Sequence, residues 1–359
     1  MAASNESSPW QTARWHSGLV PVANGTRQLS LMVSGQPRSE PAAAHPRTPL
    51  VIIAAGLGGV AAEHVMVAQL ISPFARVLRW DRAGYGASTP LNPDKDSYAM
   101  EHAVRDLFSA LGTINLPPPY VLVGQSWGGL AIREILRQRS ANEILGMVFV
   151  DANPHLQRAD LRELEEMIGT CCGADGYERV VGLHQNSIFS PSQIADLEHD
   201  SDMAEKSGVI PGEASTAEES QATVDSAFGL KTVEDADGRT IDLSFSKQPL
   251  GNGRISVIHG DVPRDLGCAL QHGRAHGFGN EELHGKLERY IEYCKRVVFK
   301  FQAAQTQLTK GEVRVRRATG TGRTHNLQST RPDIVAEEVR WVLAGSEGGG
   351  DKEDRLGHA

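Results

Sequence analysis

The sequence predicts an α/β fold with a mostly parallel, doubly wound sheet that is covered by helices on both faces. Short apolar runs such as LVIIA at 50–54 and VLVG at 121–124 lack the apolar–polar alternation of a half-exposed strand. They therefore indicate strands that are buried on both faces. Amphipathic segments of helical length separate these runs, and this alternation is typical of a parallel sheet with crossover helices. Of the 359 residues, 40% are hydrophobic and 22% charged, as in an ordinary globular chain.

The expected elements follow one another along the chain in the order that such a sheet requires. At the amino-terminal end, the β-like runs 18–22 and 28–33 flank Asn24-Gly25, which is a hairpin signal. Further strands are expected at 49–55, 75–81, 119–124, 146–151, 254–260 and 312–318. Helices, identified by apolar residues at helical spacing, are expected at 63–71, 97–112, 127–138, 280–305 and 331–345.

The chain divides into a core, one large insertion and two terminal segments. Residues 1–14 are polar and are predicted to be a disordered N-terminus, and the glycine-rich residues 346–359 a flexible tail. The α/β core is expected over 15–151 and 254–345. Between its sixth and seventh strands, residues 152–253 break the strand–helix rhythm and are predicted to be a helical, acidic lid.

Charge and cysteine content argue against several classes of protein. The net charge is -8, and residues 155–250 alone hold 19 acidic against 7 basic residues, which leaves the remainder net positive by 4. A nucleic-acid partner is not expected, because phosphate binding needs basic stripes. The sequence contains no apolar run of about eighteen residues and no recognisable leader, so neither a membrane span nor secretion is expected. Four irregularly spaced cysteines favour reduced thiols and hence a cytoplasmic protein, and the sequence specifies no oligomeric state.

The glycine-rich turn in VIIAAGLGGVAAEH, residues 51–64, is compatible with two kinds of chemistry. Gly56, Gly58 and Gly59 follow a strand, and Asp81 ends the next one, as in a dinucleotide-binding oxidoreductase. However, the flavin-type spacing would also need a glycine at Ala54, and this interpretation explains nothing downstream. The alternative is a serine hydrolase, in which such a turn aims a backbone N–H at a developing oxyanion.

The downstream motif Gly124-Gln125-Ser126-Trp127-Gly128 favours the hydrolase interpretation. It follows an apolar strand and opens a helix, which is the context of a G-x-S-x-G nucleophile elbow. The elbow holds serine in a strained conformation, and Gly124 and Gly128 lack the Cβ atoms that would collide there. Ser126 is therefore the predicted nucleophile.

Together, four motifs resemble the α/β-hydrolase family over roughly residues 17–345. They are AGLGG, DRAGYGAS after the next strand, GQSWGG, and THNLQSTRPD before the last helix. The resemblance implies that the backbone N–H groups of Leu57 and Trp127 form the oxyanion hole, each of which contributes on the order of 3 kcal/mol. Many relatives have histidine where this chain has Ala55, so a side chain that braces this loop is missing here.

Among the 13 histidines, His325 has the position of the family's general base, in a polar turn between the last strand and the last helix. His272 and His276 are four residues apart but have no third ligand at a suitable spacing, so no metal is expected. The acid is less clearly marked. Asp151 directly follows the strand at 146–151 and is ranked first, and it is followed by Asp265 and then Asp261, both after the strand at 254–260.

The resemblance implies a serine hydrolase that cleaves a carboxylic ester, lactone or related acyl bond of a small organic substrate through an acyl-enzyme, without a cofactor. Hydrolysis of thioesters or of carbon–carbon bonds is an open alternative, as is a slow-turnover or non-catalytic ligand receptor on the same fold. Haloalkane dehalogenases and epoxide hydrolases use an aspartate nucleophile, so Ser126 disfavours both. The acidic region 152–253, expected to cover Ser126, disfavours strongly anionic substrates.

Overall fold

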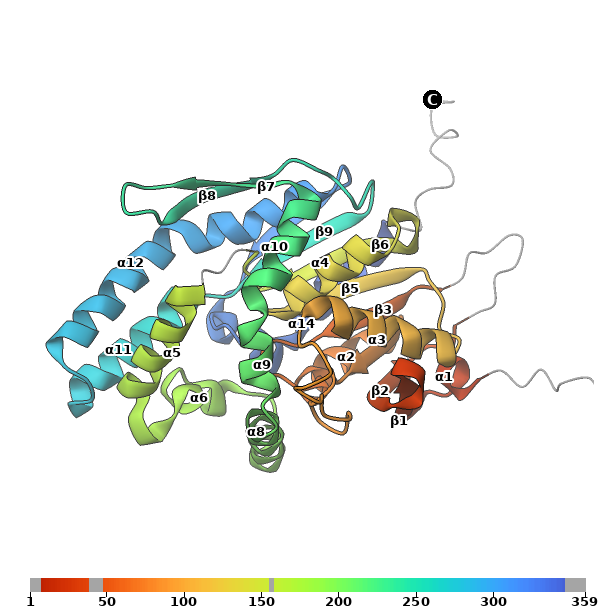
Figure 1. Cartoon of the computed structure of the whole chain (residues 1–359), viewed down its shortest axis with the longest axis horizontal. Coiled ribbons are helices and arrows are strands. Elements are labelled where there is room, and N and C mark those ends of the chain that lie inside the picture. Colours follow the sequence, from red (N-terminus) through yellow and green to blue (C-terminus); the bar gives the residue numbers. More distant parts are fainter. Residues whose placement is uncertain (1–7, 39–47, 155–157, 346–359) are drawn as a thin grey trace, which may run out of the picture.

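A mostly parallel sheet of eight strands runs through the centre of the molecule (Figure 1). The computed structural model describes residues 8–38, 48–154 and 158–345. The strand order is β1-β2-β4-β3-β5-β6-β9-β10, and only the pairs β1–β2 and β2–β4 are antiparallel. The strands of this sheet are β1 Trp15–Val22, β2 Arg27–Gly35, β3 Leu50–Ala54, β4 Arg76–Trp80, β5 Tyr120–Gln125, β6 Ile144–Val150, β9 Arg254–His259 and β10 Val313–Arg317. The predicted α/β class, with its mostly parallel sheet, is confirmed.

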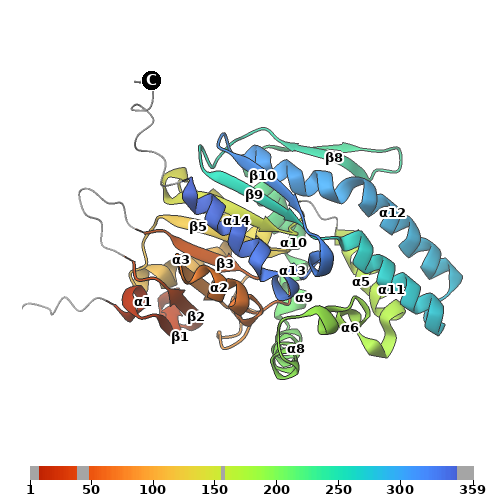
Figure 2. The same cartoon turned by 180° about the vertical axis from the view of Figure 1, so that it is seen from behind.

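Helices cover both faces of the sheet. Helices α3 (Met100–Thr113) and α4 (Gly128–Gln138) lie on the face seen in Figure 1, whereas α2 (Val65–Ile71) and α14 (Pro332–Ala344) lie on the opposite face, seen in Figure 2. Strand β3 shows why the apolar runs do not alternate with polar residues. Its side chains point in turn into the two hydrophobic cores on either side of the sheet, and all five residues of the strand are buried.

A helical region is inserted between the sixth and seventh strands of the main sheet, β6 and β9, as the sequence predicts. Its helices are α5 Arg158–Cys172, α6 Tyr177–Val180, α7 Leu183–Asn186, α8 Pro191–Lys206, α9 Val209–Ser215 and α10 Ala217–Phe228. The insertion also contains an antiparallel hairpin, β7 (Leu230–Glu234) with β8 (Thr240–Phe245), which the sequence did not predict. The Asp235 side chain organises its turn by accepting from the backbone N–H groups of Asp237 and Arg239.

A second excursion lies between β9 and β10. Helix α11 (Val262–His276) was not predicted, whereas α12 (Glu281–Ala304) occupies the expected position of the long helix. The two helices pack side by side, and α12 also packs against the hairpin strand β8 (Figures 1 and 2). The remaining short elements are α1 Pro9–Thr12, η1 Ala23–Gly25, η2 Ala61–His64, η3 Ala141–Glu143, η4 Gly173–Asp175, η5 Gln305–Leu308, η6 Gly320–Gly322 and α13 Leu327–Thr330.

The predicted disorder of residues 1–14 does not hold over the part that the structure describes, because residues 9–12 form the short helix α1. The buried Arg76 guanidinium accounts for this order. It donates hydrogen bonds of 2.6–3.2 Å to the backbone oxygens of Pro9, Trp10 and Ala13. Residues 1–7, and the tail at 346–359, lie outside the described residues.

No helix in the described part of the chain combines the length and the apolar character that crossing a bilayer requires.

Candidate active site

Ser126 lies at a sharp turn between β5 and α4, at the carboxyl edge of the sheet. Its φ of 51° lies in the left-handed region, which non-glycine residues rarely adopt. Close packing makes the flanking glycines necessary, since a Cβ at Gly124 would lie 2.3 Å from the Gly128 carbonyl oxygen, and one at Gly128 would lie 2.1 Å from that of Ala54. A strained serine between two obligatory glycines is the backbone geometry that a nucleophile elbow requires.

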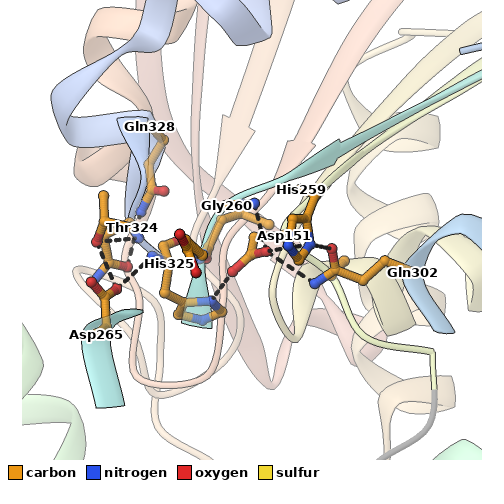
Figure 3. Close-up of polar contacts among 12 residues, drawn as sticks. Asp151, His259, Gly260, Asp265, Gln302, Thr324, His325 and Gln328 are labelled. Carbon is orange, nitrogen blue, oxygen red and sulfur yellow. Dashed lines mark hydrogen bonds and ion pairs between the residues drawn. The ribbon is translucent and has the colours of Figure 1, made fainter. Parts of the chain in front are cut away.

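His325 lies in the loop between η6 and α13, and its imidazole is hydrogen-bonded to Asp151. The distance from Nδ1 to Asp151 Oδ2 is 2.8 Å, and Figure 3 shows the two side chains pointing toward each other. Asp151 follows β6 and is 1% exposed. Its other oxygen, Oδ1, accepts from the Gly260 backbone N–H at 2.8 Å and from Gln302 Nε2 at 2.9 Å. Asp151 is therefore held in one orientation, and that orientation fixes the imidazole.

The hydrogen bond between Asp151 and His325 shifts both pKa values. Burial would raise the pKa of Asp151, but the hydrogen bond and charge of His325 outweigh it and hold that pKa below its usual value. Burial would also lower the pKa of His325, whereas the hydrogen bond and charge of Asp151 raise it above the ordinary value of 6.5. The site therefore favours the ionised carboxylate and stabilises a protonated imidazole beside it.

The other two candidate acids do not contact the His325 side chain. Asp265, in the first turn of α11, is fully buried, and its Oδ2 accepts from the His325 backbone N–H at 2.8 Å and from Thr324 Oγ1 at 2.9 Å. Asp261 caps α11 and forms an ion pair with Arg323 at 2.7 Å. Asp265 thus anchors the loop that carries His325, and Asp261 stabilises a helix end.

The two predicted oxyanion donors lie on either side of Ser126. Trp127 directly follows it, and the loop at Gly56 approaches it so closely that a Cβ on Gly56 would lie 3.3 Å from Ser126 Cβ. Leu57, the next residue of this loop, lines the same cavity as Ser126. Among the described residues, neither the Leu57 nor the Trp127 backbone N–H has a hydrogen-bond acceptor. Both donors are therefore available to a bound oxygen.

A cavity of about 380 Å³ opens above Ser126 and His325. The Gly56–Gly59 loop and the segment around His325 form one side of it, and residues of α6 to α8 from the insertion form the other, including Tyr177, Leu183 and Ile194. No hydrogen bond joins Ser126 Oγ to His325 within the described residues. Such contacts are often long in unliganded enzymes and tighten when substrate binds.

Two polar residues of this site were not identified from the sequence. Gln302, on α12, donates a hydrogen bond to Asp151. In the sequence it stands out only as a polar residue next to Phe301, which belongs to the apolar stripe of that helix. Glu63 lines the cavity and caps its own turn by accepting from the Val60 N–H at 3.3 Å. Burial raises the pKa of Glu63 to about 7, and its charge contributes to the raised pKa of His325.

The described residues contain no group of three or more histidine, cysteine or acidic side chains arranged to bind a metal ion. The rings of His272 and His276 stack with centroids 4.1 Å apart, and His272 Nε2 lies 3.2 Å from Asp175 Oδ2.

Comparison with known proteins supports an alpha/beta hydrolase fold. Residues 48–169 match the family model described as alpha/beta hydrolase fold. An AB hydrolase superfamily protein of Gibberella zeae is 26% identical over 343 residues, which is 93% of this chain and 98% of that protein. A protein of Hormonema carpetanum named as a probable transporter is also 26% identical, and the match spans 94% of this chain but 44% of that protein.

Solved structures agree with this assignment of the fold. A protein from Pseudomonas aeruginosa assigned as an epoxide hydrolase superposes with a TM-score of 0.59 at 14% identity, covering 93% of this chain and 97% of that one. A protein from Acinetobacter baumannii assigned as a lipase gives a TM-score of 0.55 at 13% identity, covering 94% and 93%. The chain therefore has the α/β-hydrolase fold.

Proposed function

We propose that this protein is a serine hydrolase that cleaves a carboxylic ester, lactone or related acyl bond of a small organic substrate. The observation that carries the proposal is that Ser126, in its strained turn, lines the same cavity as His325, whose imidazole is hydrogen-bonded to Asp151. A cavity of about 380 Å³ suits a small organic molecule. A serine at the elbow, rather than an aspartate, favours acyl transfer over epoxide opening.

In the proposed mechanism, Ser126 Oγ attacks the carbonyl carbon while its proton passes to His325. Asp151 keeps the imidazole in the required tautomer and stabilises the imidazolium. The carbonyl π electrons move to the oxygen, and the Leu57 and Trp127 N–H groups donate hydrogen bonds to the resulting oxyanion.

Collapse of this tetrahedral intermediate expels the alcohol, which takes the proton from His325 and leaves an acyl group on Ser126. Water, deprotonated by His325, then releases the acid and restores the serine. These steps use side chains and water, without a cofactor.

The insertion at residues 152–253 acts, in this proposal, as a lid over the nucleophile. Its helices α6 to α8 already provide one wall of the cavity, so its movement would change both substrate access and exclusion of water. The surrounding residues 15–151 and 254–345 act as the catalytic core.

A fluorophosphonate probe tests the nucleophile directly, because it reacts with activated serines. The Ser126→Ala variant is expected to lose labelling completely and to lose esterase turnover by about 10⁶-fold. A matched control is Ser201→Ala, which removes another serine of the same cavity and should leave labelling intact. Labelling that persists in Ser126→Ala would contradict the proposal.

A slow-turnover or non-catalytic receptor on the same fold is the second candidate. The two candidates differ in steady-state behaviour. A hydrolase turns over p-nitrophenyl butyrate many times per active site, whereas a receptor stops after one equivalent or less. A thioester or carbon–carbon hydrolase would show turnover only with those bonds.

A further inference from the structure

A buried ion pair connects the insertion to the catalytic core. Arg82, in the loop after β4, is 3% exposed, and Glu213, on α9 of the insertion, is 4% exposed. Arg82 Nε lies 2.6 Å from Glu213 Oε1, and Nη2 lies 3.0 Å from Oε2, so the pair is bidentate. The Tyr85 hydroxyl adds a third bond by donating to Glu213 Oε2 at 2.7 Å. This carboxylate is therefore fully engaged by the core.

The core side of the same network holds the loop that carries Leu57. Arg82 Nη1 donates to the Ala55 carbonyl oxygen at 3.0 Å, and Nη2 donates to that of Gly56 at 2.8 Å. The Gly58 backbone N–H donates to the Tyr85 hydroxyl at 3.2 Å. The peptide groups immediately before and after Leu57 are thus both fixed by side chains from one loop.

These contacts determine where the Leu57 N–H points. The Gly56 carbonyl and the Leu57 N–H belong to one planar trans peptide unit, in which they point in opposite directions. Arg82 on the carbonyl side consequently directs the N–H away from itself. A cation bound to a carbonyl also polarises the amide, which makes its N–H a stronger donor.

The network constrains a loop that has little rigidity of its own. A loop containing three glycines resists rotation of its peptide groups only weakly, and Ala55 has no polar side chain that could brace it. Arg82 and Tyr85 supply the missing constraint. Arg82 in turn needs Glu213, because a guanidinium buried without a counter-charge is strongly destabilising.

We propose that Glu213 is a positioning residue that makes the oxyanion donor at Leu57 depend on docking of α9, so that the insertion and the oxyanion hole form one unit. The inference rests on the proposed function, because it assigns the Leu57 N–H to a developing oxyanion. When α9 is displaced, Arg82 loses its carboxylate and the Gly56–Leu57 peptide loses its anchor. Catalysis is then efficient only with the insertion closed over the site.

The test compares two carboxylates that each bind a buried arginine across the boundary between core and insertion. Glu213→Gln removes the carboxylate charge that pairs with Arg82, next to the Gly56–Gly59 loop that carries Leu57. Asp225→Asn is the matched control, since Asp225 binds the fully buried Arg133 of α4 at 3.1 Å, and Arg133 donates to the Gly129 and Pro154 carbonyls rather than to the Gly56–Leu57 peptide. The readouts are kcat and KM for p-nitrophenyl butyrate, and Ki for a trifluoromethyl ketone, whose serine adduct places an oxyanion in the hole.

Glu213→Gln is expected to lower kcat and raise Ki, each by about 10²-fold, and to leave KM unchanged. Asp225→Asn is expected to leave the ratio of Ki to KM at the wild-type value. If Glu213→Gln fails to fold, Tyr85→Phe replaces it as the test variant. It removes the hydroxyl that anchors Gly58 and should raise the same ratio by a smaller factor.

An unchanged ratio of Ki to KM in Glu213→Gln or, where that variant does not fold, in Tyr85→Phe would overturn the proposed coupling. An equal rise of the ratio in Asp225→Asn would do so as well, because it would indicate general loosening of the insertion. If Ser126→Ala abolishes labelling in the same series, such results leave the hydrolase function intact. Labelling that persists in Ser126→Ala would instead overturn the hydrolase function, and the coupling with it.

Discussion

The end of β6 and the first turn of α11 each direct a buried aspartate at His325, but the two aspartates bind different parts of that residue. Asp151 accepts from the imidazole Nδ1 at 2.8 Å, and Asp265 accepts from the backbone N–H, also at 2.8 Å (Figure 3). At equal distance and with similar burial, one carboxylate acts on the ring and the other on the loop. Proximity to a histidine therefore does not identify an acid of a triad, whereas the atom it contacts does.

The pKa values of the two carboxyls show the same contrast. Burial raises both, yet the pKa of Asp151 ends below its usual value and that of Asp265 above it. The bonds of Asp265 to a hydroxyl, a backbone N–H and the partly exposed Arg264 do not compensate for burial. Asp151 instead pairs with an imidazole that becomes cationic during catalysis, so its interaction strengthens as the transition state forms.

Of the two aspartate substitutions, Asp151→Asn is expected to lower turnover the most. The amide cannot balance the imidazolium and favours the wrong tautomer, so kcat should fall by about 10³- to 10⁴-fold. Steady-state hydrolysis of p-nitrophenyl butyrate measures it, with circular dichroism as a check on folding. If Asp265→Asn loses as much turnover as Asp151→Asn, the proposed division of roles is wrong.

Sequence reasoning located the strand ends well but not the paths of the loops between them. Asp151 directly follows an apolar strand, so its place at the carboxyl edge could be predicted. Asp265 could not be separated from it, because α11 was not expected and its first turn determines where that carboxylate points. The roles of Ser126, His325 and Asp151 remain predictions.

The contacts that sequence reasoning missed are those between distant segments. The fold class could be predicted, and is confirmed, because strands and amphipathic helices are encoded locally. Arg82 and Glu213 are 131 positions apart, and Gln302 lies 151 positions from Asp151. Local patterns say nothing about such pairs. The hairpin β7–β8 was missed for a different reason, because its turn lies in a run of acidic residues that resembled solvated loop.

The two aspartates should also differ in how their substitution changes the pH dependence of activity, which is a smaller effect than the loss of kcat in Asp151→Asn. His325 must be neutral to act as a base, and its pKa lies above 6.5, so kcat/KM should fall as the pH decreases through that raised value. Without the Asp151 carboxylate, only the charges of Asp265 and Glu63 oppose the effect of burial, so the pKa of His325 should be lower than in the wild type. The acid limb of Asp151→Asn should therefore move to lower pH, although its maximum is much reduced.

In Asp265→Asn, the acid limb should stay close to that of the wild type, because Asp265 contributes less than Asp151 to the raised pKa of His325. Rates measured from pH 5 to 9 on both variants decide the matter. If the acid limb shifts more in Asp265→Asn than in Asp151→Asn, Asp265 rather than Asp151 sets the pKa of His325, and the proposed division of roles is wrong.

The smallest effect on turnover is expected for Asp265→Asn itself. The amide keeps one acceptor oxygen but places an NH₂ group where three donors converge, from Arg264, Thr324 and the His325 backbone. At least one of these donors loses its acceptor, and together with the loss of the carboxylate charge this costs about 1–3 kcal/mol of unfolding free energy. Because the imidazole keeps its bond to Asp151, kcat should fall by no more than about tenfold.

Urea unfolding and kcat, measured together, separate these two consequences for Asp265→Asn. Asp261→Asn is its matched control in the same turn of α11, where the bond to the exposed Arg323 lies largely in solvent. Such a surface pair contributes roughly 0–1 kcal/mol, and asparagine remains a good helix cap, so both stability and kcat should stay near the wild type. If Asp265→Asn also unfolds like the wild type, the buried carboxylate does not anchor the His325 loop, and its bond to the backbone has no role in positioning the base.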